Sequence, residues 1–187
     1  MATVRSAITM TDQEIEAFVR DRRTAILATI GRDGQPHLTA MWFALVDGRI
    51  VFETKSKSQK AVNVRRNPRV TVLLEDGLTY PELRGVSFEG TVEVIENADA
   101  SRAYLRAVAR GVLDRYTASA RNTGSPGTPD TAGSPGSTDD AALDQVMYKR
   151  VALVLHPDRV RSWDHRKLRL DPTTPLSPPP PKRGPHA

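Results

Sequence analysis

Residues 50–74 read IVFETKSKSQKAVNVRRNPRVTVLL, and this stretch decides both the fold and where a site is expected. An apolar strand pattern at each end encloses a short helix. We expect that helix to begin at about Ser58 and to stop before Asn67-Pro68, because the residue before a proline avoids the helical conformation. Free N–H groups and the positive dipole at the helix start would meet three lysines there, an arrangement suited to phosphate: Lys55, Lys57 and Lys60. An ordinary helix cap surrounded by solvated lysines explains the pattern equally well.

The chain on both sides of this stretch reads as short strands with few helices. Strands are expected at residues 24–30, 36–46, 49–54, 70–75, 86–95 and 150–155, and 160–163 would extend or follow the last one. Helices are expected from a capping box at residues 11–14 to about residue 22, and from Asp99 to about Tyr116. Most connections are too short for helices that cross between parallel strands. The pattern therefore predicts a mainly β fold with peripheral helices, a small antiparallel barrel.

Composition excludes several kinds of chemistry. The chain has 187 residues, the size of one ordinary domain, and no cysteine, which rules out disulfides, cysteine-bound metals and thiol nucleophiles. Its 4 histidines lie at spacings that do not suit a metal site. No apolar run approaches the roughly 20 residues of a bilayer span, and the first residues do not resemble a signal peptide. We expect a cytoplasmic protein with no metal and no membrane association.

Three segments are predicted to lie outside a folded core at residues 11–165. Residues 1–10 are expected to be a flexible N-terminus. Residues 117–140 contain GSPG twice and almost no apolar side chain except alanine, so they read as a disordered insertion. The tail at residues 171–187 is rich in proline and is expected to be disordered.

The net charge of +5 is concentrated in one place. Residues 55–69 carry six cations and no acid, which raises the alternative of a nucleic-acid or regulatory binding module. Aromatic residues make up only 5% of the chain, which leaves few platforms for stacked bases. We therefore expect a small-molecule partner and no nucleic acid.

The order of Phe52-Glu-Thr54, Ser58-Gln-Lys60 and Asn67-Pro68 resembles the flavin-binding segment of the pyridoxamine 5′-phosphate oxidase-like split-barrel superfamily. Together with PHLTAMWF at residues 36–43, it is similar to the branch of that superfamily that binds the deazaflavin coenzyme F(420). The resemblance implies a six-stranded antiparallel Greek-key split β-barrel that forms a homodimer, with a coenzyme in each of two clefts at the interface. It also implies an F(420)-dependent oxidoreductase, in the direction of a reductase, that moves hydride between the deazaflavin and a small organic substrate.

The same resemblance assigns roles to individual residues. Thr54, Ser58 and Lys60 match the residues that contact the phosphate. The loop between them supplies Lys55, Ser56 and Lys57, and the two lysines would reach the phosphate or a polyglutamate tail. A ring-binding strand would carry Thr39, Met41 and Trp42, although Trp42 could equally pack the barrel. Trp163 would border the partner subunit's cofactor, or be an ordinary interface or core aromatic.

Two departures argue against oxidation of pyridoxamine phosphate. Gln59 stands where the FMN oxidases often carry Arg, and residues 166–171 do not reproduce the Arg and His with which those oxidases hold their substrate. An FMN-binding oxidase or reductase, or a flavin carrier without turnover, remains an alternative on the same fold. No catalytic residue is identified, because candidate proton donors such as Tyr80 and Tyr148 cannot be placed from the sequence.

Overall fold

A computed structural model describes residues 4–123 and 139–169 of the chain. The helices are α1 (Val4–Ile8), α2 (Asp12–Asp21), α3 (Gln59–Arg66), α4 (Arg102–Thr123) and α5 (Asp140–Met147), with 3-10 turns at Tyr80–Glu82, Asp99–Ser101 and His165–Leu168. The strands are β1 (Thr24–Ile30), β2 (Pro36–Trp42), β3 (Ala44–Val46), β4 (Arg49–Lys55), β5 (Arg69–Asp76), β6 (Arg84–Ile95) and β7 (Arg150–Asp164).

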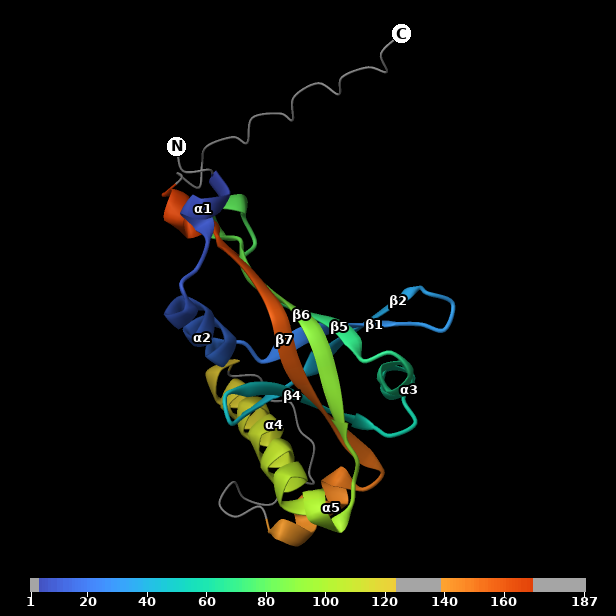
Figure 1. Ribbon diagram of the computed structural model, residues 1–187. Coiled ribbons are helices and arrows are strands. Elements are labelled where there is room, and N and C mark those ends of the chain that lie inside the picture. The colour runs from blue at the N-terminus through green and yellow to red at the C-terminus, as the bar shows by residue number, and fades with distance from the viewer. Residues whose placement is uncertain (1–3, 124–138, 170–187) are drawn as a thin grey trace.

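One antiparallel sheet, in the order β2-β1-β5-β6-β7-β4-β3, forms the body of the molecule (Figure 1). β2 and β3 lie at its opposite edges, yet Phe43 alone separates them in the chain. The chain through Phe43 therefore joins the two edges and curls the sheet into a split barrel. The predicted strand 36–46 is broken into two segments at the fully buried Phe43, because the chain passes there from one edge of the sheet to the other. The expected mainly β antiparallel fold is confirmed.

β7 shows how the sheet and helices share the core. Every residue from Val151 to Leu155 is buried. Val151, Leu153 and Leu155 point into the barrel, while Ala152 and Val154 pack under α4 and α5. A run buried on both faces explains why this part of the sequence is continuously apolar rather than alternating.

A bulge lets β7 continue well beyond the predicted end at residue 155. Gly90 on β6 pairs with Pro157 while Glu89 pairs with Arg159, so Asp158 has no partner in the ladder. Bulges tolerate proline because one residue is left out of the hydrogen-bonding pattern. Gly90 is required there, since a Cβ would lie 2.1 Å from the carbonyl oxygen of His156.

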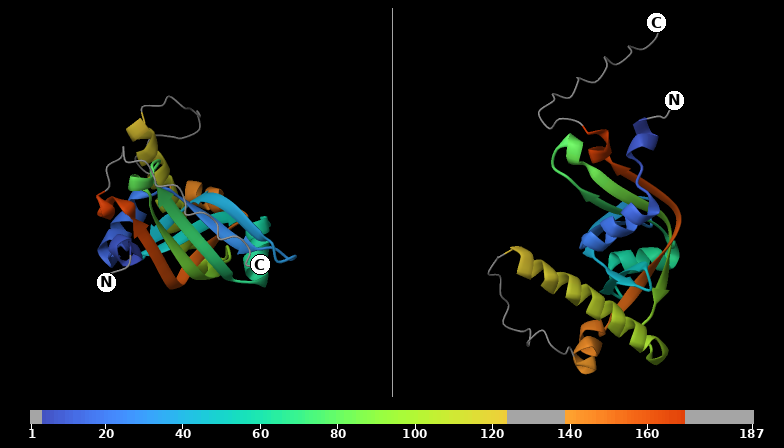
Figure 2. Two further views of the ribbon diagram at one scale, coloured as in Figure 1. Left: turned by 90° about the horizontal axis from the view of Figure 1, so that it is seen from above. Right: turned by 90° about the vertical axis from the view of Figure 1, so that its left-hand side faces the viewer.

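α4 and α5 correct the predicted insertion. The sequence placed residues 117–140 in a disordered segment, but α4 continues through Thr123 and α5 begins at Asp140. Arg106 on α4 binds Asp140 at 2.7 Å and Asp144 at 2.5 Å, which fixes the two helices against each other. Figures 1 and 2 show them at one end of the long β6–β7 ladder. Residues 124–138 and the predicted tail at 171–187 lie outside the described residues.

The N-terminal segment is also corrected. Residues 1–10 were expected to be flexible, but Val4–Ile8 form α1 and Met10 is buried. The N–H of Met10 donates to Ser162 Oγ at 3.0 Å, so β7 holds this segment. The predicted capping box of Thr11 and Glu14 is confirmed at the start of α2.

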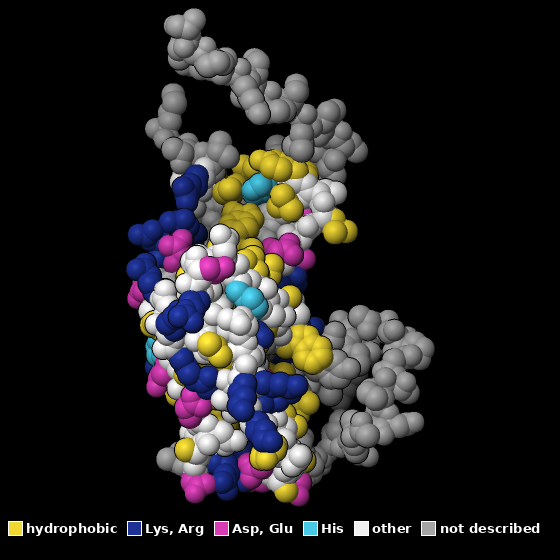
Figure 3. Space-filling model, turned by 90° about the vertical axis from the view of Figure 1, so that its right-hand side faces the viewer, with side chains coloured by type: hydrophobic (Ala, Val, Ile, Leu, Met, Phe, Trp, Pro, Cys, Tyr) yellow, Lys and Arg dark blue, Asp and Glu magenta, His cyan; other side chains and the backbone are white. Residues whose placement is uncertain are grey.

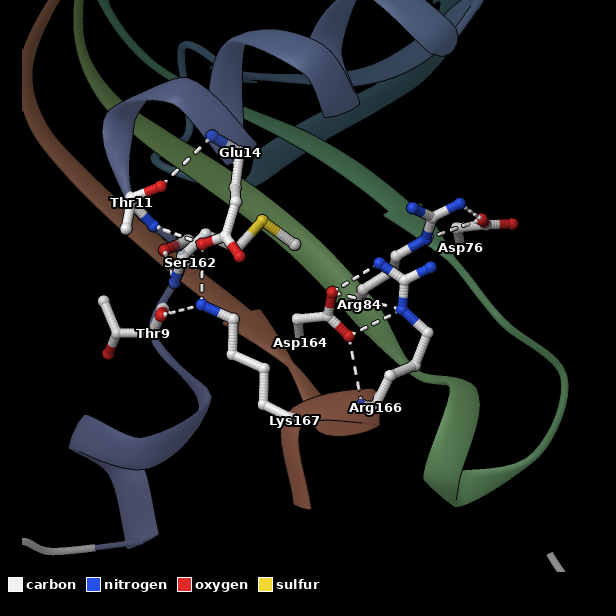
Figure 4. A network of polar contacts seen from close by, with 10 residues as sticks. Thr9, Thr11, Glu14, Asp76, Arg84, Ser162, Asp164, Arg166 and Lys167 are labelled. Atoms are coloured by element: carbon white, nitrogen blue, oxygen red, sulfur yellow. Dashed lines mark hydrogen bonds and ion pairs between the residues drawn. The ribbon is translucent and has the colours of Figure 1, made fainter. Parts of the chain in front are cut away.

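A polar network fixes the far end of the β6–β7 ladder (Figure 4). Lys167 donates to the carbonyl of Thr9 at 2.7 Å and to Glu14 at 2.6 Å, which ties the C-terminal turn to the N-terminal segment. Arg166 contacts the buried carboxylate of Asp164 through Nε at 2.8 Å and Nη2 at 2.5 Å.

No helix in the described part of the chain is long and apolar enough to cross a bilayer.

Candidate functional site

The turn from β4 to α3 has the geometry that the sequence predicted. Ser58 caps α3, and its Oγ accepts the N–H of Ala61 at 3.4 Å. The hydroxyl oxygens of Thr54 and Ser58 lie 3.0 Å apart, at hydrogen-bonding distance. Thr54 is only 5% exposed, so its hydroxyl bonds to Ser58 in a site that is largely shielded from solvent. The two hydroxyls thus stabilise each other at the start of α3.

The first turn of α3 provides free donors beside this pair. The N–H groups of Gln59 and Lys60 belong to the first turn and have no carbonyl partner within the helix. Lys60 is half-buried, and it makes no ion pair with any residue that the structure describes. Backbone donors and one ammonium group therefore meet at the helix start, as an anion site requires.

Ser56 is engaged inside the loop. Its N–H donates to the carbonyl of Lys149 at 2.9 Å. Arg65 donates to the Ser56 carbonyl at 2.6 Å and to its Oγ at 3.0 Å, and the same guanidinium binds Glu96 at 2.7 Å. Ser56 thus helps to hold the loop in shape. The sequence analysis counted Arg65 only as one of six cations. Its two hydrogen bonds to Ser56 depend on how the chain turns between the two residues, which the sequence does not show.

Lys55 and Lys57 are exposed and face the end of α5. Together with Lys149 and Arg150 they line a cleft with a volume of about 1010 Å³. From the side of α3 and the β1–β2 hairpin, Figure 3 shows Lys and Arg side chains both along the upper left edge and over the lower half of the surface, with acidic side chains among them. The sequence did not place Lys149 here, because its position follows from the pairing of Lys55 with Arg150 across β4 and β7.

β2 is an edge strand that offers main-chain groups to a ligand. Within the described residues it pairs with β1 alone, so its other edge carries unpaired N–H and C=O groups. Thr39 and Met41 are half-buried and point inward, and Met41 packs on the barrel core. Trp42 points the other way and is 49% exposed. The three residues predicted to contact the coenzyme ring, Thr39, Met41 and Trp42, therefore lie on two different faces of the sheet. A ring bound at the edge of β2 would contact the main-chain groups of the strand before these side chains.

A pocket of about 570 Å³ joins the start of β2 to α3. Asn63 is fully buried; its Nδ2 donates to Thr29 Oγ1 at 3.0 Å, and its Oδ1 accepts from Gln59 at 2.8 Å. His37, from the start of β2, lines the same pocket, and its Nδ1 is buried without a hydrogen-bond partner. The fold thus brings the start of β2 beside the first turn of α3, which gives a ligand both a strand edge and a helix start.

Glu53 lies on β4 next to Thr54 but faces the opposite side of the sheet. Burial raises the pKa of its carboxyl, and Arg150 at 3.3 Å opposes that shift. Its Oε2 is buried and makes no hydrogen bond. Arg150 is therefore already partnered on the inner side of the cleft.

Trp163 lies far along β7 from Thr54 and the start of α3 in the same chain. Thr54 pairs with Val151 at the start of β7, and Trp163 is near its end. Twelve residues of strand separate Trp163 from Val151, a span of roughly 40 Å. Tyr80 is at the Trp163 end, with its ring 4.5 Å from that of His165, whereas Tyr148 lines the cleft beside Lys149. One copy of the chain does not bring Trp163 to α3.

Comparison with protein families gives a match over nearly all of the described chain. A family model described as pyridoxamine 5′-phosphate oxidase matches residues 11–164. Among curated proteins, the F420H(2)-dependent biliverdin reductase of Mycobacterium tuberculosis is 33% identical over 106 residues, which are 54% of this chain and 72% of the reductase. The pyridoxine/pyridoxamine 5′-phosphate oxidase of Cupriavidus metallidurans is 30% identical over 95 residues, which are 50% of this chain but only 43% of the oxidase.

Solved structures show the same architecture. The conserved hypothetical protein Rv2991 from Mycobacterium tuberculosis is 48% identical, with a TM-score of 0.74, and the match covers 94% of this chain and 98% of that one. A structure described as an F420 reductase is 25% identical, with a TM-score of 0.50, and covers 78% of this chain and 94% of that one.

Proposed function

Because this chain belongs to the pyridoxamine 5′-phosphate oxidase-like split-barrel family of flavin- and deazaflavin-binding oxidoreductases, we propose that it is an F(420)-dependent reductase acting on a small organic substrate. One observation favours F(420) over FMN as the coenzyme of this chain. The chain spans most of the length of both relatives described by that coenzyme, but less than half of the oxidase from Cupriavidus metallidurans.

The residues present suit the phosphate of such a coenzyme. The free N–H groups of α3, the Ser58 hydroxyl and the Lys60 ammonium would hold it, while Thr54 positions Ser58. The orphaned Nδ1 of His37 lies in the pocket between this point and β2, where a bound ligand would give it a partner. Each of these groups can hydrogen-bond or neutralise an anion.

The edge of β2 suits the ring. When bound, the deazaflavin supplies a hydride from a ring carbon. The chain's part is to hold the ring against the unpaired main-chain groups of β2 and to keep water away from it. Two large apolar side chains are exposed on the outward face of the same strand, Leu38 at 62% and Trp42 at 49%. They favour an apolar substrate.

We also propose that the site is completed by a second copy of the chain in a homodimer. Trp163 can border a coenzyme at α3 only if it comes from another protomer, because the β7 strand separates the two within one chain. The outward face of β1, β2 and β5 carries several apolar side chains that a partner would cover: Ile26, Ala28, Leu38, Ala40, Trp42 and Leu73. Apolar faces of this kind favour association.

FMN is the second candidate, because the hydroxyls and Lys60 at the start of α3 would serve either phosphate. The presence of pyridoxine/pyridoxamine 5′-phosphate oxidases among the curated relatives supports it. Gln59 is uncharged and bonds to Asn63, so this position does not supply the cation that the oxidases often carry there. If this chain were an FMN enzyme or carrier, it would therefore bind the phosphate with one positive charge fewer than those oxidases do.

The nucleic-acid alternative loses support from the way the basic helix is used. Arg65 is bound to Ser56 and Glu96, and Arg66 donates to the carbonyl of Ile30. Both guanidinium groups thus stabilise the fold around α3, and fewer of the six cations remain for a phosphate backbone.

A spectroscopic titration tests the proposed function. Purified protein is titrated separately with F(420) and with FMN, and turnover of reduced F(420) is then followed by absorbance with a panel of unsaturated acceptors. We expect micromolar or tighter binding of F(420), and oxidation of the reduced coenzyme by at least one acceptor. Micromolar binding of FMN with none of F(420) would refute the proposal.

A further inference from the structure

The side chain of Asn63 is a buried amide on α3, the helix that packs beside β1 (Figure 1). The two other buried residues of this helix, Ala61 and Val64, are apolar. An apolar side chain at position 63 would avoid the cost of taking an amide out of water. Buried amides persist where their polar atoms are bonded, and such a network favours one arrangement of the elements around it. Asn63 therefore holds α3 in one position against β1.

Hydrogen bonds connect Asn63 to both parts of the proposed coenzyme site. On one side, Gln59 in the first turn of α3 donates to its Oδ1 at 2.8 Å. On the other side, its Nδ2 donates to the hydroxyl of Thr29, which is also fully buried, at 3.0 Å. That hydroxyl donates in turn to the main-chain carbonyl of His37 at 3.4 Å, across the β1–β2 pair. A continuous chain of polar contacts thus runs from the first turn of α3 to the start of β2.

A second contact between α3 and β1 has a different character. Arg66, in the last turn of α3, donates to the carbonyl of Ile30 at the end of β1. This hydrogen bond is exposed, and it reaches neither the first turn of α3 nor β2. Removing it would leave the chain of contacts through Asn63 in place. Arg66 is therefore a matched control for Asn63.

The proposed coenzyme would be held on both sides of this chain of contacts. Its phosphate is expected at Ser58 and Lys60, and its ring at the edge of β2. Because these two anchoring points lie on separate elements, the distance between them depends on how α3 sits against β1 and β2. A displacement of about 1 Å can slow a reaction on the order of a hundredfold. The same displacement would change binding much less, since every group that holds the coenzyme is still present.

We propose that Asn63 is a positioning residue: it sets the start of β2 relative to the start of α3, and so places the coenzyme ring for hydride transfer; this rests on the proposed F(420) dependence. It acts on β2 through Thr29, whose hydroxyl reaches the His37 carbonyl. It acts on the helix start through Gln59, which follows the Ser58 cap. The two links require a side chain that donates and accepts at once, as an amide does.

The test uses variants that separate position from stability. Asn63→Leu and Thr29→Val are close in shape to the native residues, and each breaks the chain of contacts. Each also leaves its former partner without a hydrogen bond in the interior. In the double variant Asn63→Leu/Thr29→Val both partners are apolar, so the temperature of unfolding should return towards that of the wild type. Thr29→Ser keeps the hydroxyl, and Arg66→Ala removes the other contact between α3 and β1.

Three quantities are measured for each protein. They are the temperature of unfolding of the apoprotein, the dissociation constant of F(420) by fluorescence, and the single-turnover rate of hydride transfer at saturating reduced F(420). The acceptor is the one that the wild type reduces fastest in the panel that tests the proposed function. The first two quantities report on folding and binding independently of turnover.

We expect Asn63→Leu and Thr29→Val each to lower the single-turnover rate on the order of tenfold or more, with less than about a threefold change in the dissociation constant. The double variant should be no slower than the slower single variant, because both residues act in one chain of contacts. Thr29→Ser and Arg66→Ala should keep the rate within about twofold of the wild type.

The double variant decides between positioning and a purely structural role. An unfolding temperature that recovers while the rate stays low supports the proposal. If the rate recovers together with the unfolding temperature, Asn63 only stabilises the fold and the proposal is wrong. Wild-type rates in Asn63→Leu and Thr29→Val, or an equal loss of rate in Arg66→Ala, overturn it as well.

The comparison of Thr29→Val with Thr29→Ser covers the case in which Asn63→Leu does not fold. Equal rates in these two variants would show that the hydroxyl link to β2 does not place the ring. A wild type that does not bind F(420), or that reduces no acceptor with it, means instead that the proposed function has failed.

Discussion

Gly85 and Trp163 lie opposite each other in the β6–β7 ladder, and the indole ring covers the glycine so closely that no side chain fits between them. A Cβ at position 85 would lie 2.3 Å from Cζ2 of Trp163. The glycine thus sets the orientation of the one tryptophan that is expected to reach a partner subunit.

Gly85→Ala should displace the indole and lower the free energy of unfolding by about 1–3 kcal/mol, the usual cost of overpacking. The measurement is chemical denaturation with tryptophan fluorescence in a Trp42→Phe background, where Trp163 is the only indole. Ser87→Ala, on the same strand, is the control because it adds no atom. An unchanged emission spectrum would show that Trp163 does not depend on Gly85.

Lys60→Ala should weaken coenzyme binding by about 1–3 kcal/mol, the scale of a hydrogen bond to a charged group. The reason is that Lys60 lies in the first turn of α3 and makes no ion pair within the described part of the chain. Titration of the variant with F(420) measures the change, with Arg49→Ala as a control for net charge. An unaltered dissociation constant would remove Lys60 from the site.

Arg65→Lys should weaken coenzyme binding several-fold although it keeps the charge. A lysine cannot reproduce the planar fork that reaches both oxygens of Ser56, so the turn that carries Lys55 and Lys57 would loosen. Binding is compared with that of Arg69→Lys, an exposed arginine with no ion pair among the described residues. Equal binding by both variants would mean that the turn keeps its shape without Arg65.

Asp164→Asn should destabilise the protein by about 1–3 kcal/mol at pH 7, because Arg166 would lose a charged acceptor. Hydrogen bonds from Arg166 hold the pKa of Asp164 below the ordinary value of 3.8, against the effect of its burial. A lowered carboxyl pKa gives stability that is present above pH 3.8 and is lost as the pH falls through the folded-state pKa. The difference in the free energy of unfolding between wild type and variant should therefore shrink below about pH 4.

The pH dependence is measured by urea denaturation between pH 3 and pH 7. Asp158→Asn serves as the control, since Asp158 is an exposed carboxylate on the same strand with no ion pair in the described residues. If the free energies of unfolding of wild type and Asp164→Asn differ by the same amount across this pH range, the lowered pKa of Asp164 is contradicted.

Local patterns in the sequence predicted much of the fold. Strand 24–30 and the cap at Ser58 are where the sequence placed them, since alternation, capping and the Asn67-Pro68 stop act over a few residues. The break at Phe43 and helix α5 were missed. Phe43 breaks its strand only because the barrel closes there, and α5 depends on contacts between Arg106 and its two aspartates.

For the candidate site, the sequence by itself determined the chemistry: a strand, a loop of lysines and serines, and a capped helix whose start attracts an anion. These features depend on neighbouring residues and so can be read along the chain. Only the tertiary structure decided which distant groups join them. The register of β4 with β7 brings Lys149 to the loop, and the length of β7 takes Trp163 away from it, because strand pairing and strand length fix distances that residue order does not contain.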